Sequence, residues 1–274
     1  MKFLRMRVPG GFSVACLDAG SSRAGGAPPL VLLHGIGADH GEWALSLPFL
    51  SRRRRVLAFD LLGHGRSDKP AGAGVAYRVR FLADAVAGGI EALPDPPERV
   101  DLLGHSLGGA VALDLARRNP RLVRRLVLVD AAGPPIERSI DPLAASLPFV
   151  PGSFEDSRRL LATSVNNRFL SHPLVALAAA VYKGRRKNRP LLLKLVASMA
   201  SGEDALGSRD LARIGNETLV LWGDRDRIFP LATGRALARA LPRARLEVLP
   251  RCGHVPPTER PVAFARRVVA FLDS

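Results

Sequence analysis

The stretch Val100-Asp101-Leu102-Leu103-Gly104-His105-Ser106-Leu107-Gly108-Gly109 decides the fold of this chain. Its first part is a short, mostly apolar run of strand length, and its last part opens an Ala- and Leu-rich segment that predicts a helix running toward Pro120. Residues 104–108 match the pattern G-x-S-x-G, in which a serine occupies a sharp turn from strand to helix. The pattern therefore predicts that the Ser106 hydroxyl projects from the carboxyl edge of a sheet, where the helix directs free N–H groups.

Strand-like and helix-like segments alternate on both sides of this stretch. Apolar runs of strand length lie at 12–17, 30–33, 55–60, 126–130, 218–222 and 245–249, and helical segments at 42–50, 81–93, 231–241 and 262–272. Residues 1–27 are predicted to form an opening hairpin region. Strands that alternate with helices indicate an α/β fold with a doubly wound, mostly parallel sheet. In such a sheet the ligand binds at the carboxyl ends of the strands.

The alternation stops between about Pro134 and Ile214, where the sequence is helix-like and interrupted by prolines. We predict an inserted helical cap at residues 134–213, above a core that comprises residues 1–133 and 214–274. A cap at this place would cover the pocket above Ser106. Its candidate pocket residues, each with a packing or surface role as the alternative, are Phe149, Phe154, Asn166, Phe169, His172 and Tyr182. Among these, Tyr182 is predicted to contact substrate.

The charge of the chain is +15 over 274 residues, and arginine carries most of it. The arginines are scattered, apart from short clusters such as 52–55 and 185–187, and no nucleic-acid-binding motif accompanies them. We therefore expect solvated surface charges and no nucleic-acid partner. A weak association with an anionic membrane surface is the alternative, and it would weaken with salt.

The cysteines and the ends of the chain indicate a cytoplasmic protein. The two cysteines, Cys16 and Cys252, form neither a disulfide framework nor a metal-site spacing, so we expect no metal and no cofactor. Arginines interrupt the N-terminal apolar residues, which argues against a signal peptide. No run of about 20 apolar residues predicts a transmembrane helix.

A catalytic serine needs a base to take its proton, and the base needs an acceptor that fixes its tautomer. His254 is the best base of the six histidines because it follows the last predicted strand. For the acid we prefer Asp226 over Asp224 because it lies farther from the end of its strand, with Asp130 as the alternative site. The resulting order of serine, aspartate and histidine is the one expected with this motif.

At these positions the chain resembles the α/β-hydrolase family. The matching motifs occur in family order and cover the chain outside the cap: His34-Gly35, Asp60 with Gly63-His64-Gly65-Arg66-Ser67, Gly104 to Gly109, Gly223-Asp224-Arg225-Asp226, Gly253-His254 and the tail Glu259-Arg260-Pro261. The resemblance implies that Ser106 is the nucleophile, His254 the base and Asp226 the acid. It also implies an oxyanion hole formed by the backbone N–H groups of Ile36 and Leu107. His34, Gly35 and His105 beside this site are expected to contact substrate, whereas His64 and Asp60 shape the neighbouring loop.

The serine at the turn distinguishes this chain from haloalkane dehalogenases and epoxide hydrolases, relatives that use an aspartate there. Ester, thioester, amide or carbon–carbon hydrolysis remains, together with cofactor-free perhydrolysis. The layout is similar to meta-cleavage-product hydrolases, which cleave vinylogous diketones but commonly have Asn where this chain has His105; Arg185 or Arg186 could supply the pocket arginine of that branch.

The difference at His105 favours a serine esterase that cleaves a small-molecule carboxylic ester through an acyl-enzyme. Carbon–carbon hydrolysis of vinylogous diketones is the first alternative. A hydrolase-fold protein that binds a ligand without turning it over is the second. A monomer and a homodimer are both compatible with the sequence.

Overall fold

The computed structural model describes residues 1–20, 26–70, 75–132, 153–166 and 188–274. One eight-stranded sheet has the order β1-β2-β4-β3-β5-β6-β7-β8. Its strands are β1 Lys2–Arg7, β2 Ser13–Ala19, β3 Leu30–Leu33, β4 Val56–Asp60, β5 Val100–His105, β6 Val123–Val129, β7 Glu217–Gly223 and β8 Ala244–Leu249. β2 pairs antiparallel with β1 and with β4, and every other pair is parallel. The predicted doubly wound, mostly parallel sheet is confirmed.

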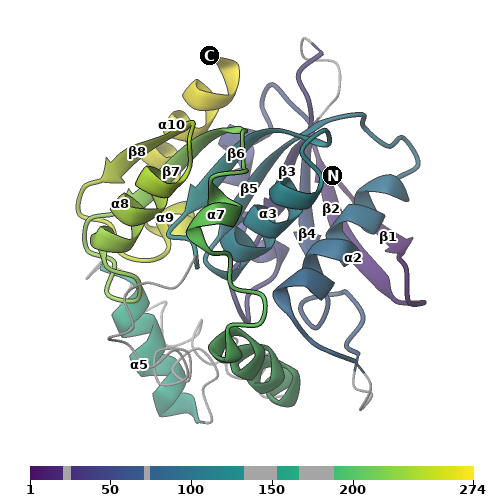
Figure 1. Cartoon of the computed structure of the whole chain (residues 1–274), viewed down its shortest axis with the longest axis horizontal. Helices are drawn as coiled ribbons and strands as arrows, with labels where there is room; N and C mark the ends of the chain where they lie inside the picture. The colour runs from purple at the N-terminus through teal and green to yellow at the C-terminus, as the bar shows by residue number, and fades with distance from the viewer. Residues whose placement is uncertain (21–25, 71–74, 133–152, 167–187) are drawn as a thin grey trace.

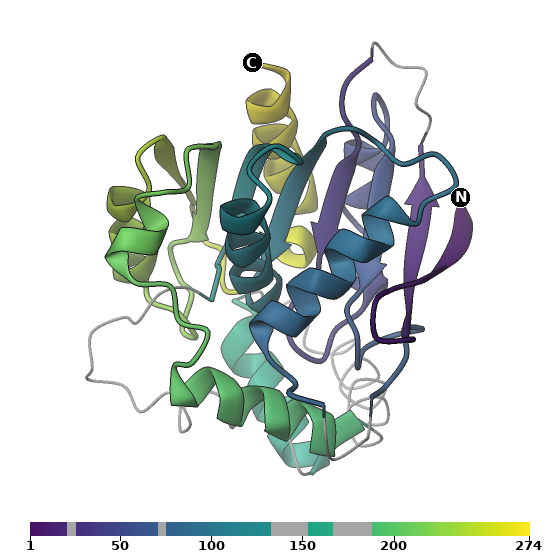
Figure 2. The same cartoon turned by 45° about the vertical axis from the view of Figure 1, so that its right-hand side comes forward.

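Helices cover both faces of the sheet, which explains why its central strands are continuously apolar. Figures 1 and 2 show α2 (Val79–Glu91) and α3 (Leu107–Arg118) side by side on one face. In β3, Val31 and Leu33 pack into the core on this side. α8 (Leu231–Ala240) packs on β7 and contributes Leu237 to this same core. Leu30 and Leu32 instead join the core that contains residues of α1 (Leu47–Leu50) and α10 (Pro261–Asp273). Successive side chains therefore serve opposite layers.

The register of the parallel strands brings their carboxyl ends to one edge. Leu33 of β3 is paired with Phe59 of β4 and with Gly104 of β5. His105 is in turn paired with Val129 of β6. The residues that follow these strands, where the sequence places its polar side chains, are consequently neighbours at a single edge.

One predicted helix is divided in the structure, and one short helix was not predicted. The segment 42–50 is divided into η1 (His40–Trp43) and α1, with fully buried Trp43 and Ser46 at the division. Pro48 lies in the first turn of α1, where its missing N–H costs no helical hydrogen bond. The closing helix is preceded by a short helix, α9 (Pro256–Glu259), and a new start at Pro261.

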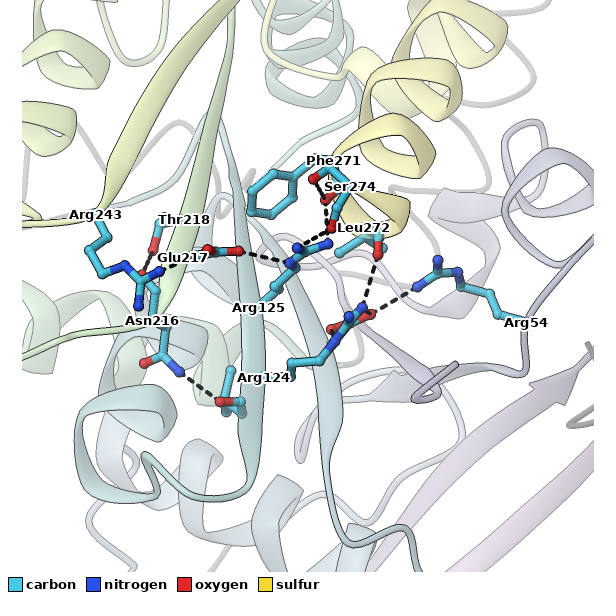
Figure 3. A network of polar contacts seen from close by, with 12 residues as sticks. Arg54, Arg124, Arg125, Asn216, Glu217, Thr218, Arg243, Phe271, Leu272 and Ser274 are labelled. Carbon is cyan, nitrogen blue, oxygen red and sulfur yellow. Dashed lines mark hydrogen bonds and ion pairs between the residues drawn. The ribbon is translucent and has the colours of Figure 1, made fainter. Parts of the chain in front are cut away.

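The amino ends of the strands carry a network of arginines and carboxylates that fastens α10 to the sheet (Figure 3). Asp101 at the start of β5 accepts Arg54 at 2.8 Å and Arg124 at 2.6 Å. Arg124 also donates to the carbonyl oxygen of Leu272 in α10, at 2.9 Å. Arg54 is buried, so the expectation that the 52–55 cluster is a solvated face is wrong for this residue.

Two described helices of the segment between β6 and β7 lie at the opposite end of the sheet from the C-terminus (Figures 1 and 2). They are α5 (Phe154–Ser164) and a helix at 188–201, drawn in green. Leu192, Leu195 and Val196 from the second helix join the core on the α2 and α3 side. The short helix α7 (Ser208–Leu211) then leads into β7. The cap boundaries 134 and 213 remain a prediction, and no described helix is long and apolar enough to cross a membrane.

Candidate active site

Ser106 occupies the turn between β5 and α3 with φ 51° and ψ −118°. A non-glycine residue rarely adopts a positive φ, so this backbone is strained and needs support from its surroundings. Two glycines make the turn sterically accessible. A Cβ on Gly104 would lie 2.1 Å from the carbonyl oxygen of Gly108, and a Cβ on Gly108 would lie 2.1 Å from the carbonyl oxygen of Leu33.

Main-chain hydrogen bonds supply the support for this turn. The N–H of Ser106 donates to the carbonyl oxygen of Val129 at 3.1 Å. The Ser106 carbonyl oxygen accepts from the N–H groups of Gly109 at 2.8 Å and Ala132 at 2.9 Å. The serine is thereby fixed between β5, β6 and α3, and only 4% of its surface is exposed.

The predicted base and acid are in contact: His254 Nδ1 lies 2.8 Å from Asp226 Oδ2. Asp226 Oδ1 accepts the N–H groups of Ile228 at 2.7 Å and Phe229 at 3.0 Å. Burial alone would raise the pKa of Asp226, but the bonds from His254 and the two N–H groups hold that pKa below its ordinary value. Asp224, the rejected candidate, instead accepts the N–H of Cys252 at 3.1 Å.

The protonation state of His254 suits a base. Its burial lowers the pKa of the imidazole, and the negative charge of Asp226 only partly opposes this effect. His254 is therefore neutral near pH 7. The contact of Nδ1 with the carboxylate places the proton on Nδ1, which leaves Nε2 to accept a proton.

Asp130, the alternative acid position, lies beside this pair. Single ligand-type atoms of Asp130, Asp226 and His254 all lie within 4.8 Å of one another. Asp130 Oδ1 accepts the N–H of Gly223 at 2.9 Å. Burial, and next the charge of Asp226, raises the pKa of Asp130 well above its ordinary value. Asp130 is thus the neutral partner of the two carboxyl groups, and Asp226 carries the negative charge.

The loop that carries His254 is bound to the described part of the insertion. The N–H of His254 donates to the carbonyl oxygen of Ser164 at the end of α5, at 2.8 Å. Glu259 accepts the N–H groups of Gly253 at 3.0 Å and of Asn166 at 2.8 Å. The sequence identified Glu259 only as part of the family-like tail and predicted no contact for it. Its position five residues after the predicted base was the available signal.

The glycine-rich loop after β3 touches the serine turn. A Cβ on Gly35 would lie 3.4 Å from the Ser106 Cβ, so no side chain separates this loop from the nucleophile. Leu107 is the first residue of α3, and its N–H therefore has no acceptor within the helix. Ile36 follows Gly35 in the same loop. The oxyanion hole formed by Ile36 and Leu107 remains a prediction that this placement supports.

The two histidines predicted to contact substrate are engaged by the protein. His34 Nδ1 lies 2.8 Å from the carbonyl oxygen of Gly35, and His34 Nε2 accepts the N–H of Leu61 at 3.0 Å. His105 lies between Glu42 and the carbonyl oxygen of His254. Neither ring presents a nitrogen to a ligand in this arrangement, so a substrate contact by His34 or His105 stays a prediction without geometric support.

Several candidates from the insertion fall outside the described residues: Phe149, Phe169, His172, Tyr182, Arg185 and Arg186. Sequence reasoning also missed Glu42. This residue was assigned to the helical segment 42–50, and the sequence contains no signal that separates a buried carboxylate from an exposed one there.

Two groups of described residues bring three potential metal ligands within 4.8 Å of one another. One is the group of Asp130, Asp226 and His254. In the other, with Asp39 and His40, the Asp60 carboxylate accepts backbone N–H groups of His40 at 2.7 Å and Arg66 at 2.8 Å. Hydrogen bonds within the protein account for the placement of the Asp60 and Asp226 carboxylates.

Comparison with known proteins gives three further findings. The model of the alpha/beta hydrolase family matches residues 30–267. The chain is 36% identical over 262 residues to 2-hydroxymuconate semialdehyde hydrolase from Pseudomonas sp. strain CF600, which covers 91% of this chain and 88% of that protein.

Two solved structures are also similar. The meta-cleavage product hydrolase from Pseudomonas fluorescens IP01 has a TM-score of 0.85 at 27% identity and covers 98% of this chain and 97% of its own. A bacterial membrane phospholipase A has a TM-score of 0.82 at 31% identity and covers 99% of this chain and 86% of its own.

Proposed function

Because the chain belongs to the alpha/beta hydrolase family, we propose that it is a serine hydrolase that cleaves a carbon–carbon bond in a vinylogous diketone. The substrate class is a 2-hydroxy-6-oxo-dienoate, the kind of molecule named by 2-hydroxymuconate semialdehyde hydrolase. The observation that carries the proposal is the 36% identity to that enzyme over nearly the whole of both chains. The similarity to the meta-cleavage product hydrolase structure supports the same chemistry.

The comparisons favour this reaction over the ester hydrolysis expected from the sequence. That expectation depended on His105 standing where the carbon–carbon hydrolases commonly have Asn. In the structure both nitrogens of His105 face protein oxygens, at 2.6 and 2.7 Å. His105 therefore carries no information on whether the leaving group is an alcohol or a carbon atom.

Each step of the proposed reaction is assigned to a named group of the candidate site. His254 takes the Ser106 proton as Oγ attacks the 6-oxo carbonyl carbon, and the N–H groups of Ile36 and Leu107 stabilise the resulting oxyanion. The bond breaks in the 2-oxo tautomer, which forms when the proton of the 2-hydroxyl group moves to C5 before the attack. The C5–C6 bond then breaks, and its electron pair is delocalised over the conjugated 2-oxo fragment. That fragment receives the proton from His254. Water activated by the same histidine releases the acid from Ser106, so that one water is consumed per bond broken.

A substrate panel tests the proposal. Hydrolysis of 2-hydroxymuconate semialdehyde and of aryl-substituted 2-hydroxy-6-oxo-dienoates is compared with hydrolysis of p-nitrophenyl esters. We expect kcat/KM to be higher for the dienoates by about 10²-fold or more, because a site complementary to one transition state discriminates by differential binding. Higher kcat/KM for the esters would contradict the proposal and indicate a serine esterase instead.

The variant Ser106→Ala and a fluorophosphonate probe separate catalysis from binding. Intact mass should show one adduct on the wild type and none on Ser106→Ala. Turnover should fall in that variant by a factor on the order of 10⁶, as for other serine triads, while circular dichroism remains unchanged. A dienoate that binds tightly to a protein without adduct or turnover would identify a non-catalytic receptor instead.

A further inference from the structure

His105 is placed between two hydrogen-bond acceptors. Its Nδ1 lies 2.6 Å from Glu42 Oε1, and its Nε2 lies 2.7 Å from the carbonyl oxygen of His254. A neutral imidazole has one N–H and can donate to only one of these oxygens, whereas the imidazolium donates to both. The ring is 3% exposed, so water does not replace either partner. The bond to the His254 carbonyl oxygen and the 2.6 Å contact with the Glu42 carboxylate together point to a protonated His105.

Glu42 is placed to hold that proton. Its side chain is 7% exposed, and its second oxygen accepts the N–H of Gly35 at 3.0 Å. Burial would lower the pKa of His105, but the charge of Glu42 raises it above the ordinary value. Burial would likewise raise the pKa of Glu42, but His105 lowers it. Each group thus stabilises the charge of the other in a site closed to solvent.

The neighbouring titratable groups do not change the assignment of a protonated His105 and an ionised Glu42. Asp226, from the loop after β7, raises the pKa of His105 further. The positive charge of His105 lowers the pKa of His254, and the negative charge of Glu42 raises it. The two members of the pair therefore shift the pKa of His254 in opposite directions.

The pair connects three segments that the reaction needs in fixed relation. Gly35 precedes Ile36 in the predicted oxyanion loop, His105 precedes Ser106 at the turn, and His254 is the base. A Cβ on Gly35 would lie 3.1 Å from His105 Nδ1, so the oxyanion loop also rests directly on the ring. We propose that the buried His105–Glu42 ion pair is a positioning device that holds the backbone of the base and of the oxyanion loop in register with Ser106.

This inference rests on the proposed serine hydrolase function, but it places His105 and Glu42 outside the reacting groups. They act through the main chain of His254 and of Gly35. A misplacement of about 1 Å at a reacting group can cost about 10² in rate. Loss of either charge should therefore lower kcat with little change in KM, since the substrate-binding surface is not altered.

Imidazole NMR on ¹⁵N-histidine-labelled wild-type protein tests the charge directly. The His105 signals, assigned by their loss in His105→Gln, should show protons on both nitrogens at pH 7.5. That pH is well above the ordinary histidine pKa of about 6.5. A neutral His105 at pH 7.5 would overturn the proposal. This measurement needs neither substrate nor turnover.

Variants Glu42→Gln and His105→Gln test the positioning. We expect the second-order rate of fluorophosphonate labelling and kcat to fall together by about 10- to 100-fold per folded molecule. The double variant should be no worse than the more impaired single variant, because the two residues act as one unit. Glu42→Asp keeps the charge, and an intermediate rate is expected for it.

Asp101→Asn is the matched control. Asp101 is another buried carboxylate, paired with buried Arg54 at 2.8 Å, and it lies at the opposite end of the strand that carries His105. This variant should lower Tm while leaving the labelling rate of the folded protein unchanged. If Glu42→Gln behaves like Asp101→Asn, with lower Tm and an unchanged labelling rate, the pair is only structural and the inference is wrong. A wild type that takes no fluorophosphonate refutes the proposed function, and the NMR result still decides the charge of His105.

Discussion

Replacement of Gly104 by alanine tests how much of the activity depends on the close approach of β5 and α3. The new Cβ would lie 2.1 Å from the carbonyl oxygen of Gly108, 2.5 Å from its carbonyl carbon and 2.7 Å from the nitrogen of Gly109. Contacts become ordinary at 3.4 Å, so the turn of the helix must retreat by about 1.3 Å. All three atoms belong to the main chain, and no side-chain rotation relieves the contact.

The retreat changes both stability and rate. Overpacking of this kind costs about 1–3 kcal/mol of unfolding free energy. Because Ser106 and Leu107 lie between Gly104 and Gly108, a shift of about 1 Å at the turn is expected to slow catalysis by about 10². Ser106 labelling by a fluorophosphonate measures the rate, and urea unfolding measures the free energy.

Gly215→Ala is the control for this substitution. No atom lies within 4 Å of a Cβ at Gly215, so its stability should change by less than about 1 kcal/mol and its labelling rate should be that of the wild type. A folded Gly104→Ala variant with a labelling rate within twofold of the wild type would refute this prediction. The turn would then tolerate the displacement that the close contacts impose.

Three further predictions concern ionisable groups. The labelling rate should rise with pH through a midpoint below 6.5, since burial lowers the pKa of His254; a midpoint above 6.5 would mean that Asp226 outweighs burial. Asp130→Asn should gain stability relative to the wild type between about pH 4 and pH 7. Folded Asp130 keeps a proton that the same residue in the unfolded chain loses above about pH 3.9. This difference lowers the stability of the wild type as pH rises, and it is absent from Asp130→Asn. Urea unfolding at both pH values checks this, and an equal difference at the two would contradict it. Glu259→Gln should lower the free energy of unfolding by about 1–3 kcal/mol and slow labelling, because an NH₂ group would face a backbone N–H. Glu203→Gln, at an exposed position, is its control. Equal Tm values for the Glu259→Gln and Glu203→Gln variants would contradict the prediction.

The fold follows from the sequence wherever one physical requirement dominates a segment. Residues 30–33 are all apolar because both faces of β3 are covered by helices, and that pattern predicted the strand. The glycines on both sides of Ser106 predicted the tight turn for the same steric reason that the structure shows. The division of 42–50 could not be predicted, since it depends on the fully buried Trp43.

The candidate site is less fully encoded in local patterns. The contact of Asp226 with His254 agrees with the placement expected from strand ends, because the parallel register brings those ends together. The role of Glu42 could not be predicted, because an acidic residue has the same local pattern whether its partner is water or a buried N–H. Arg54 shows the same difficulty, because it is buried although its neighbours Arg52 and Arg53 are exposed.

The hydrogen bond from the His254 N–H to the Ser164 carbonyl oxygen has a consequence for how such proteins can diversify. The backbone at the end of α5 holds the loop of the base, because the Ser164 carbonyl oxygen accepts the His254 N–H at 2.8 Å. A graft that exchanged the insertion for that of another hydrolase would have to present a carbonyl group at the same point in space. We therefore expect an exchanged segment that lacks such a carbonyl group to misplace the loop that carries His254.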